Sequence, residues 1–83
     1  MHIVSRAILT AFYNQSKYAD SKDAIEAWFD VVSKAQWRTP AEVKAAFGNA
    51  SIVGNNRVVF NIKGNDYRLI VAIAYKMQWV YVK

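Results

Sequence analysis

The sequence lacks several groups on which enzymes commonly rely. Its 83 residues include no cysteine and one histidine, His2. The absence of cysteine excludes a disulfide framework and a thiolate metal site, and it fits a reducing cytoplasm. A lone histidine in a predicted terminal strand is more simply structural than catalytic or metal-binding. The sequence also has no cluster of metal-ligating residues, no phosphate-binding loop and no dinucleotide-binding fingerprint, so we expect neither a metal nor a cofactor.

Long apolar stretches are also absent. The longest apolar run, 69–75, is far too short to span a membrane. Polar residues interrupt the first six positions, so no signal peptide is expected. Hydrophobic residues still make up 54% of the chain and aromatic residues 14%, which is ample for one core. We therefore expect one cytoplasmic domain over residues 1–83, with no membrane contact.

Acidic residues are scarce in the last third of the chain. Residues 55–83 contain one acid, Asp66, and five cations, namely Arg57, Lys63, Arg68, Lys76 and Lys83. Carboxylates are concentrated earlier, at Asp20, Asp23, Glu26 and Asp30, where helical spacing indicates a solvated helix face rather than a catalytic pair. An excess of cations on a sheet suggests a surface for phosphates, and a solvated sheet edge is the alternative.

Hydrophobic periodicity divides the chain into a helical first half and a strand-rich second half. Thr39-Pro40 with Glu42 is a strong helix start, and Ser5 and Asp20 or Ser21 are expected to cap the two earlier helices. The expected elements are a strand over 2–4, helices over about 6–16, 20–35 and 40–47, and strands over 52–53, 57–62, 66–75 and 79–82.

These elements predict an α+β fold. Tight turns at 54–56 and 63–65 make the later strands pair antiparallel. Two to three N-terminal helices must then pack on one face of a mainly antiparallel sheet. In the segment 69–74 both the odd-numbered and the even-numbered residues are apolar, so both faces of a strand there would be apolar. This predicts a central strand covered on both faces. The expected core side of the helices comprises Ile8, Leu9, Phe12, Tyr13, Ala24, Ile25, Trp28, Val31, Val32 and Ala35.

Alternation along 57–62 sorts the side chains of that strand. Val58, Phe60 and Ile62 are expected to face the helices, and Arg57 and Asn61 the other side. Lys63, Asn65 and Arg68 are expected to cluster around the following turn, which leaves an outer face able to grip RNA phosphates. The candidate RNA-binding residues are Arg57, Asn61, Asn65 and Lys76. Asn65 also has a simpler interpretation as part of a Gly-Asn turn.

Metal-free cleavage of RNA needs a nucleophilic 2′-hydroxyl, charge stabilisation on the phosphorane and a proton for the leaving oxygen. Arg68 and Lys63 are the candidate catalytic residues, because cations can stabilise that charge and because the family resemblance described below implies a site here. A lysine or tyrosine with a lowered pKa would supply the proton. The alternative for Arg68 is an ion pair with Asp66.

The aromatic residues fall into two groups. Phe12, Trp28, Trp37 and Phe47 are most simply core. Trp79 and Tyr81 alternate with valines, and as an outward pair they would stack on bases or be covered by a partner protein.

The run FNIKGNDYRL at 60–69 resembles the sheet of the HigB family of bacterial toxins, which belong to the RelE-like toxin–antitoxin ribonucleases. MHIVSR at 1–6, Trp37, Thr39-Pro40 and Phe47 also match that pattern, so the resemblance runs from Met1 to Lys83. It implies a RelE-like fold and a metal-independent endoribonuclease that cleaves mRNA on the ribosome and inhibits translation. It also implies a cognate HigA-like antitoxin. The toxin would contact operator DNA only through this antitoxin.

The resemblance further implies a Thr-His-x-x-Tyr segment after Lys83, whose histidine and tyrosine are the acid–base residues of the family. The sequence ends at Lys83 without it, so we expect weakened cleavage and retained RNA binding. A non-catalytic module that binds RNA or an antitoxin is therefore the second hypothesis. A small ribosome-associated protein is the third.

Overall fold

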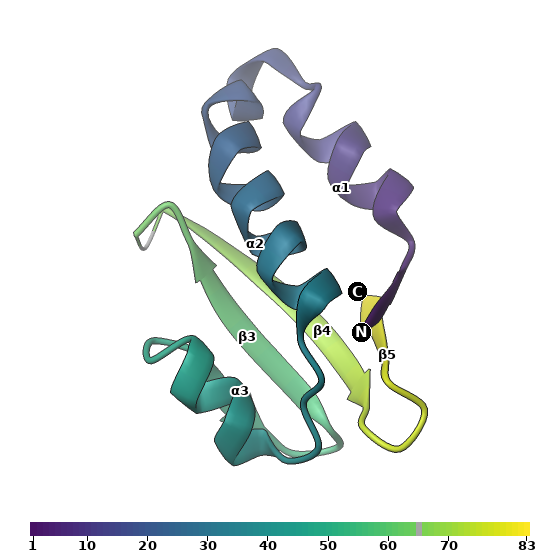
Figure 1. Ribbon diagram of the computed structural model, residues 1–83. Coiled ribbons are helices and arrows are strands. Elements are labelled where there is room, and N and C mark those ends of the chain that lie inside the picture. Colours follow the sequence, from purple (N-terminus) through teal and green to yellow (C-terminus); the bar gives the residue numbers. More distant parts are fainter. Residues whose placement is uncertain (65) are drawn as a thin grey trace.

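The computed structural model describes residues 1–64 and 66–83 (Figure 1). Over these residues the chain forms a strand, three α-helices with a short 3-10 helix between the first two, and then four strands. The elements are β1 His2–Val4, α1 Arg6–Tyr13, the 3-10 helix Ser16–Ser21, α2 Lys22–Lys34, α3 Pro40–Ala46, β2 Ser51–Val53, β3 Arg57–Ile62, β4 Tyr67–Ala74 and β5 Trp79–Val82. The α+β fold class is confirmed.

The five strands form one sheet in the order β1-β5-β4-β3-β2. The pairs β2–β3, β3–β4 and β4–β5 are antiparallel, as their short connections require, and β1 pairs with β5 in parallel. Strand β4 therefore has the predicted central position. The β1–β5 pair joins the two ends of the chain, which lie side by side in Figure 1.

The helices cover one face of the sheet, and the core lies between them. Phe60 of β3 is in edge contact with Trp28 of α2, with ring centroids 5.5 Å apart, and with Phe47 just after α3, at 5.0 Å. The Met1 ammonium group donates hydrogen bonds to the carbonyl oxygens of Val32 and Ser33 at 3.1 and 3.0 Å, which ties β1 to the end of α2. None of the helices in the described residues has the length and apolar character needed to cross a membrane.

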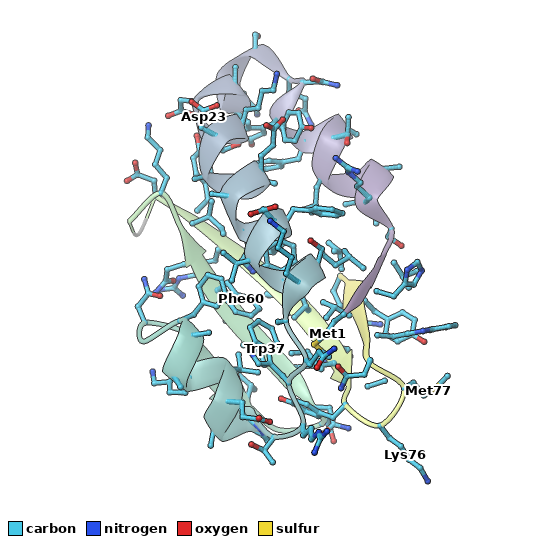
Figure 2. The ribbon with its side chains drawn as sticks, viewed as in Figure 1. Met1, Asp23, Trp37, Phe60, Lys76 and Met77 are labelled. Carbon is cyan, nitrogen blue, oxygen red and sulfur yellow. The ribbon has the colours of Figure 1, made fainter. Side chains whose placement is uncertain are left out.

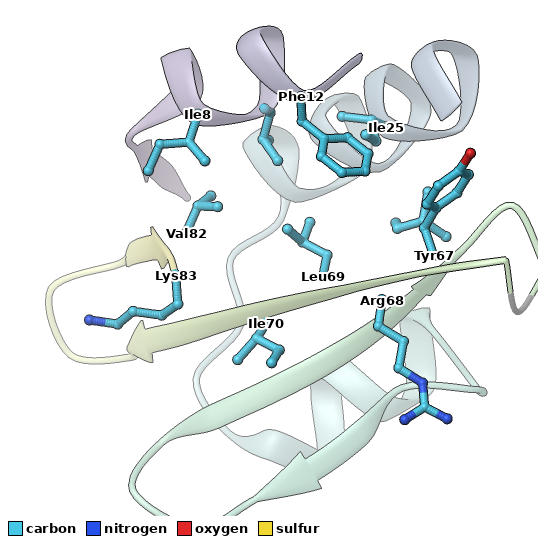
Figure 3. A pocket seen from close by; sticks show the side chains of 11 residues that line it. Ile8, Phe12, Ile25, Tyr67, Arg68, Leu69, Ile70, Val82 and Lys83 are labelled. Atoms are coloured by element: carbon cyan, nitrogen blue, oxygen red, sulfur yellow. The ribbon is translucent and has the colours of Figure 1, made fainter. Parts of the chain in front are cut away.

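The opposite face of β4 is open, so the prediction that both its faces are covered is wrong. Ile70 points away from the helices (Figure 3) and is 46% exposed. Every helix precedes the last four strands in the chain, and the strands are joined by tight turns, so no described helix reaches the far side. Apolar residues at both parities therefore give β4 one buried face and one exposed apolar face.

The expected helix boundaries need several corrections. Helix α1 ends at Tyr13, three residues before the predicted end, and a 3-10 helix follows it. Ser5 adopts a left-handed conformation with φ of 73° and its side chain caps nothing. The Ser21 hydroxyl donates to the Tyr18 carbonyl at 2.6 Å and so does not cap α2. Only at Thr39 is the predicted cap confirmed, because Thr39 and Glu42 form a reciprocal capping box.

The predicted core stripe of α2 is confirmed at its centre and wrong at its edge. Ile25, Trp28 and Val32 are buried, but Val31 is 45% exposed. On α1, Leu9 is buried and Ile8 is half-exposed. A helix that packs on a sheet buries a narrow stripe, so residues at the margin of that stripe face solvent.

Candidate nucleic-acid interface

The open face of the sheet carries two of the predicted cations. Strand register places Asn61 opposite Arg68 and Arg57 opposite Ala72, and all of these residues point away from the helices. Arg68 is directed away from the apolar layer formed by Leu69 and Tyr67 (Figure 3). Four strand positions separate Arg57 from Asn61, or about 13 Å along β3. The face therefore offers two guanidinium groups at a spacing that phosphates along an extended strand can match.

Arg68 is not neutralised by a carboxylate among the described residues. The ion pairs found there are Lys34–Asp30 and Lys63–Asp20, so the alternative of an Arg68–Asp66 pair is not what the structure shows. Both Arg57 and Arg68 are exposed. An exposed, unneutralised guanidinium can bind a phosphate through two parallel hydrogen bonds.

Asn61 shares this face but is partly engaged. Its side-chain amide donates to the Asn49 carbonyl at 3.2 Å, which ties β3 to the loop before β2. Register places Asn61 directly beside Arg68 on the open face. Asn65, the other predicted amide contact, lies outside the described residues.

Lys63 does not join Arg68 on the open face, so the predicted cluster around the turn is wrong for this residue. Its ammonium group lies 2.6 Å from Asp20 in the 3-10 helix, on the helix side of the molecule. The hydroxyl of Tyr67 donates to the second oxygen of the same carboxylate, also at 2.6 Å. Asp20 is therefore the centre of a small polar cluster, and its side chain is still 52% exposed, as the predicted solvated position requires.

The Asp20 cluster determines the protonation of its members. Hydrogen bonds from Lys63 and then Tyr67 lower the pKa of Asp20, and the same carboxylate raises the pKa of Lys63. The hydrogen bond to Asp20 raises the pKa of Tyr67 to about 12. Lys63 and Tyr67 thus hold their protons more tightly than usual, which is the opposite of the lowered pKa expected for a proton-supplying lysine or tyrosine.

The outward aromatic pair is confirmed. Trp79 is 38% exposed, and its ring centroid lies 5.9 Å from that of Tyr81 and 5.7 Å from that of His2. Register places Tyr81, Ala72 and Arg57 in one row across three strands. The open face therefore combines an aromatic patch, His2–Trp79–Tyr81, with a nearby cation.

His2 is too far from Arg68 to act with it. The two residues lie two strands apart across the sheet and about six positions apart along it. With strands about 4.8 Å apart and a rise of about 3.3 Å per residue, their separation is on the order of 20 Å. Among the described residues, Arg68 therefore has no histidine beside it, although His2 lies on the same face.

Lys76 lies in the turn between β4 and β5, at the far end of β4 from Arg68. It lines a polar pocket of about 640 Å³ together with Gln36, Arg38, Tyr75 and Gln78. Lys76 therefore lies apart from the Arg57–Arg68 face, and any phosphate that it binds would lie apart from that face as well. Sequence patterns do not reveal this pocket, because its two walls are about forty residues apart in the chain.

A second pocket, of about 280 Å³, lies between α1 and the sheet (Figure 3). Its lining is mostly apolar and includes Ile8, Phe12, Ile25, Leu69 and Val82. Pairing of β4 with β5 begins at Val71, so the first residues of β4 extend past the end of β5 and leave this space open. Among the described residues, no group of three or more histidines, cysteines or carboxylates is placed to hold a metal.

The structure thus combines an α+β fold, with helices on one face of the sheet, and an open face on which Arg57 and Arg68 have no carboxylate partner among the described residues. Residues 21–83 match the family model HigB_toxin, described as the RelE-like toxic component of a toxin-antitoxin system. The chain belongs to this family, and the α+β architecture is consistent with the RelE-like fold. No match to this chain was found among curated proteins.

Proposed function

We propose that this protein is a metal-independent endoribonuclease of a type II toxin–antitoxin system. It cleaves mRNA on the ribosome in the cytoplasm and thereby inhibits translation. Residues 1–83 act as one toxin domain, and a HigA-like antitoxin neutralises it and alone contacts operator DNA. The observation that carries the proposal is the open sheet face, where Arg57 and Arg68 have no carboxylate partner among the described residues. Membership in a RelE-like toxin family supports the same activity.

In this proposal Arg68 stabilises the developing charge on the phosphorane. It emerges near the start of the central strand, where pairing with β3 makes its backbone rigid. A guanidinium held on a rigid strand loses little conformational freedom when it binds a phosphate. Arg57 binds a neighbouring phosphate and positions the RNA strand. The Trp79–Tyr81 pair lies on the same face, where bases of that strand can reach it.

The decisive experiment is a ribosome-dependent cleavage assay on mRNA with purified protein, combined with growth measurements after induction. We expect Arg68→Ala to reduce cleavage by a factor of about 10² or more, as when an oriented charge stabiliser is removed. Lys34→Ala is the matched control, because it removes the same charge from an exposed helix pair. Equal cleavage by wild type and Arg68→Ala would remove Arg68 from the site.

A second candidate function is a non-catalytic module that binds RNA or the antitoxin. It is favoured by two observations. No histidine of the described residues lies near Arg68, and the raised pKa values of Lys63 and Tyr67 mean that both hold their protons tightly. This candidate predicts RNA binding that depends on Arg57 and Arg68, with no cleavage at any ribosome concentration. Cleavage by the wild-type protein would exclude it.

A further inference from the structure

Each strand contributes a different kind of side chain to one part of the open face. Register places Arg57 of β3, Ala72 of β4 and Tyr81 of β5 in one row across the sheet. In the next row towards the β4–β5 turn, Ala74 lies beside Trp79. With strands about 4.8 Å apart, the Cα atoms of Arg57 and Tyr81 lie about 10 Å apart. A cation on one side and two aromatic rings on the other thus flank two alanines.

The aromatic rings of this face are accessible to a ligand. Trp79 and His2 are exposed, and Tyr81 is half-buried. The Trp79 ring is tilted by 59° to His2 and by 62° to Tyr81, so these rings do not cover one another in parallel stacks and leave ring surface for a planar group. On the helix side of the sheet, by contrast, Phe60 and Trp37 stack on each other within the core, with centroids 6.3 Å apart (Figure 2).

The two alanines form a low strip between the cation and the rings. A methyl group projects much less from a sheet than an arginine or tyrosine side chain, so Ala72 and Ala74 leave room above β4 between their taller neighbours. Ile70, the next outward residue of β4, is larger and exposed, and it ends the strip on the side of Arg68 (Figure 3). We call Ala72 and Ala74 the alanine strip.

The charge of this face fits a polyanion. None of the five described strands contains an acidic residue. Arg57 and Arg68 are exposed and have no carboxylate partner among the described residues. A protein that covered the rings with apolar side chains would leave these guanidinium groups without counter-charges, whereas a nucleic acid supplies phosphates for the cations and bases for the rings. The face therefore matches a nucleic-acid strand better than a protein surface.

We propose that a single-stranded RNA lies along the alanine strip, with one base stacked on Tyr81, the ribose of that nucleotide over Ala72 and its phosphate at Arg57. The adjacent base stacks on Trp79, two positions away along β5. A nucleotide carries its base and its phosphate on opposite sides of its ribose, and β5, β4 and β3 present a ring, a methyl group and a guanidinium group in the same order. This path rests on the proposed function, because it takes RNA as the ligand of the open face, and it adds the course of the strand and the residues that determine it.

Trp79 gives a direct readout of base stacking, because Trp28 and Trp37 are buried and Trp79 is exposed. We expect binding of a short single-stranded RNA to quench the fluorescence of Trp79, and Trp79→Leu to lose this quenching. The same RNA without its bases, a chain of abasic ribose phosphates, should bind the wild-type protein at least about fivefold more weakly, as expected when base–aromatic stacking is lost. Fluorescence anisotropy measures both affinities.

Substitutions in the alanine strip test the course of the strand. Ala72→Leu fills the strip and should weaken RNA binding at least about fivefold, whereas Ala72→Ser should stay within about twofold of wild type. Val53→Leu is the matched control, because Val53 lies beside Arg57 on the side remote from the strip. Tyr81→Phe keeps the ring and should keep the affinity, and Tyr81→Leu should lose at least about fivefold. Circular dichroism confirms that each variant folds. Unchanged binding in Ala72→Leu would overturn the proposed course.

Failure of this proposal and failure of the proposed function give different results. Ribosome-dependent cleavage that Arg68→Ala reduces, with no quenching of Trp79 and equal affinity for RNA and its abasic form, would overturn the base contacts alone and leave the aromatic patch to a protein partner. Quenching and base-dependent binding without any cleavage would refute the proposed endoribonuclease and support the RNA path. No binding of RNA to the wild-type protein would refute both.

Discussion

The sharpest consequence of the structure concerns two cations that the sequence makes look equivalent. Lys63 and Arg68 flank the same turn, but Lys63 is bound to Asp20 at 2.6 Å on the helix side, and Arg68 is unpaired among the described residues on the open face. If the open face binds RNA phosphates, only Arg68 releases a counterion when RNA binds. Arg68→Ala and Lys63→Ala should therefore differ in their salt dependence although both remove one charge.

The magnitude follows from counterion release. Each phosphate contact on a single strand contributes about 0.7 to the log–log slope of affinity against salt concentration. Arg68→Ala should lower that slope by about 0.7, so its affinity penalty should shrink by about 2.5-fold between 50 and 200 mM salt. Lys63→Ala should leave the slope unchanged. Fluorescence anisotropy with a labelled single-stranded RNA across that salt range measures both, and circular dichroism confirms that both variants fold.

Two results would refute this reasoning. An equal loss of slope in Lys63→Ala would mean that the Lys63–Asp20 pair opens when RNA binds, so the two cations act together after all. An unchanged slope in Arg68→Ala and in Arg57→Ala would mean that the open face contacts no phosphates. Lys34→Ala serves as the control for net charge, because Lys34 is exposed and paired along its own helix.

Other parts of the fold make separate predictions. Trp28 is 2% exposed and packs against Phe60, so Trp28→Ala should lower the free energy of unfolding by about 3–5 kcal/mol in denaturant titrations; a loss below about 1 kcal/mol would contradict its core position. Thr39→Ala should cost about 1 kcal/mol by the same measurement, through loss of the helix cap. The pKa of Asp20 is lowered in the folded state, so its contribution to stability is present above about pH 4 and is lost as the pH falls below that value. In Asp20→Asn, stability should therefore fall less steeply with decreasing pH in the acid range. Ultraviolet titration should find one tyrosine with a pKa of about 12, and this titration should be missing in Tyr67→Phe. The stabilisation from the Tyr67–Asp20 hydrogen bond should fade as the pH rises from about 10 to 12.

Local sequence patterns were enough to predict much of the fold. The strands Arg57–Ile62 and Trp79–Val82 lie where alternation placed them, and the capping box at Thr39 starts α3. Val58, Phe60 and Ile62 are buried as the alternation required. These features depend on residues within a few positions of one another, so the sequence order alone contains the necessary information.

The candidate site was only partly predictable for the same reason. Alternation correctly placed Arg57, Asn61 and Arg68 on one face, because strand parity is local. The side-chain direction of Lys63 could not be predicted, because it follows from a φ of 53° in the turn and from a carboxylate 43 residues away. The pocket around Gln78 was missed because its partner, the Trp37 carbonyl, lies 41 residues earlier in the chain.

Taken by itself, the sequence determined the order of the elements, the face of β3 that is buried and the concentration of cations in the last third of the chain. Only the tertiary structure decided that β1 pairs with β5, that the second face of β4 is open and that Asp20 binds Lys63. The physical reason is the range of the interactions involved. Periodicity and capping act over a few residues, but ion pairs, edge pairing and the side from which helices cover a sheet depend on which distant segments meet after the chain has folded.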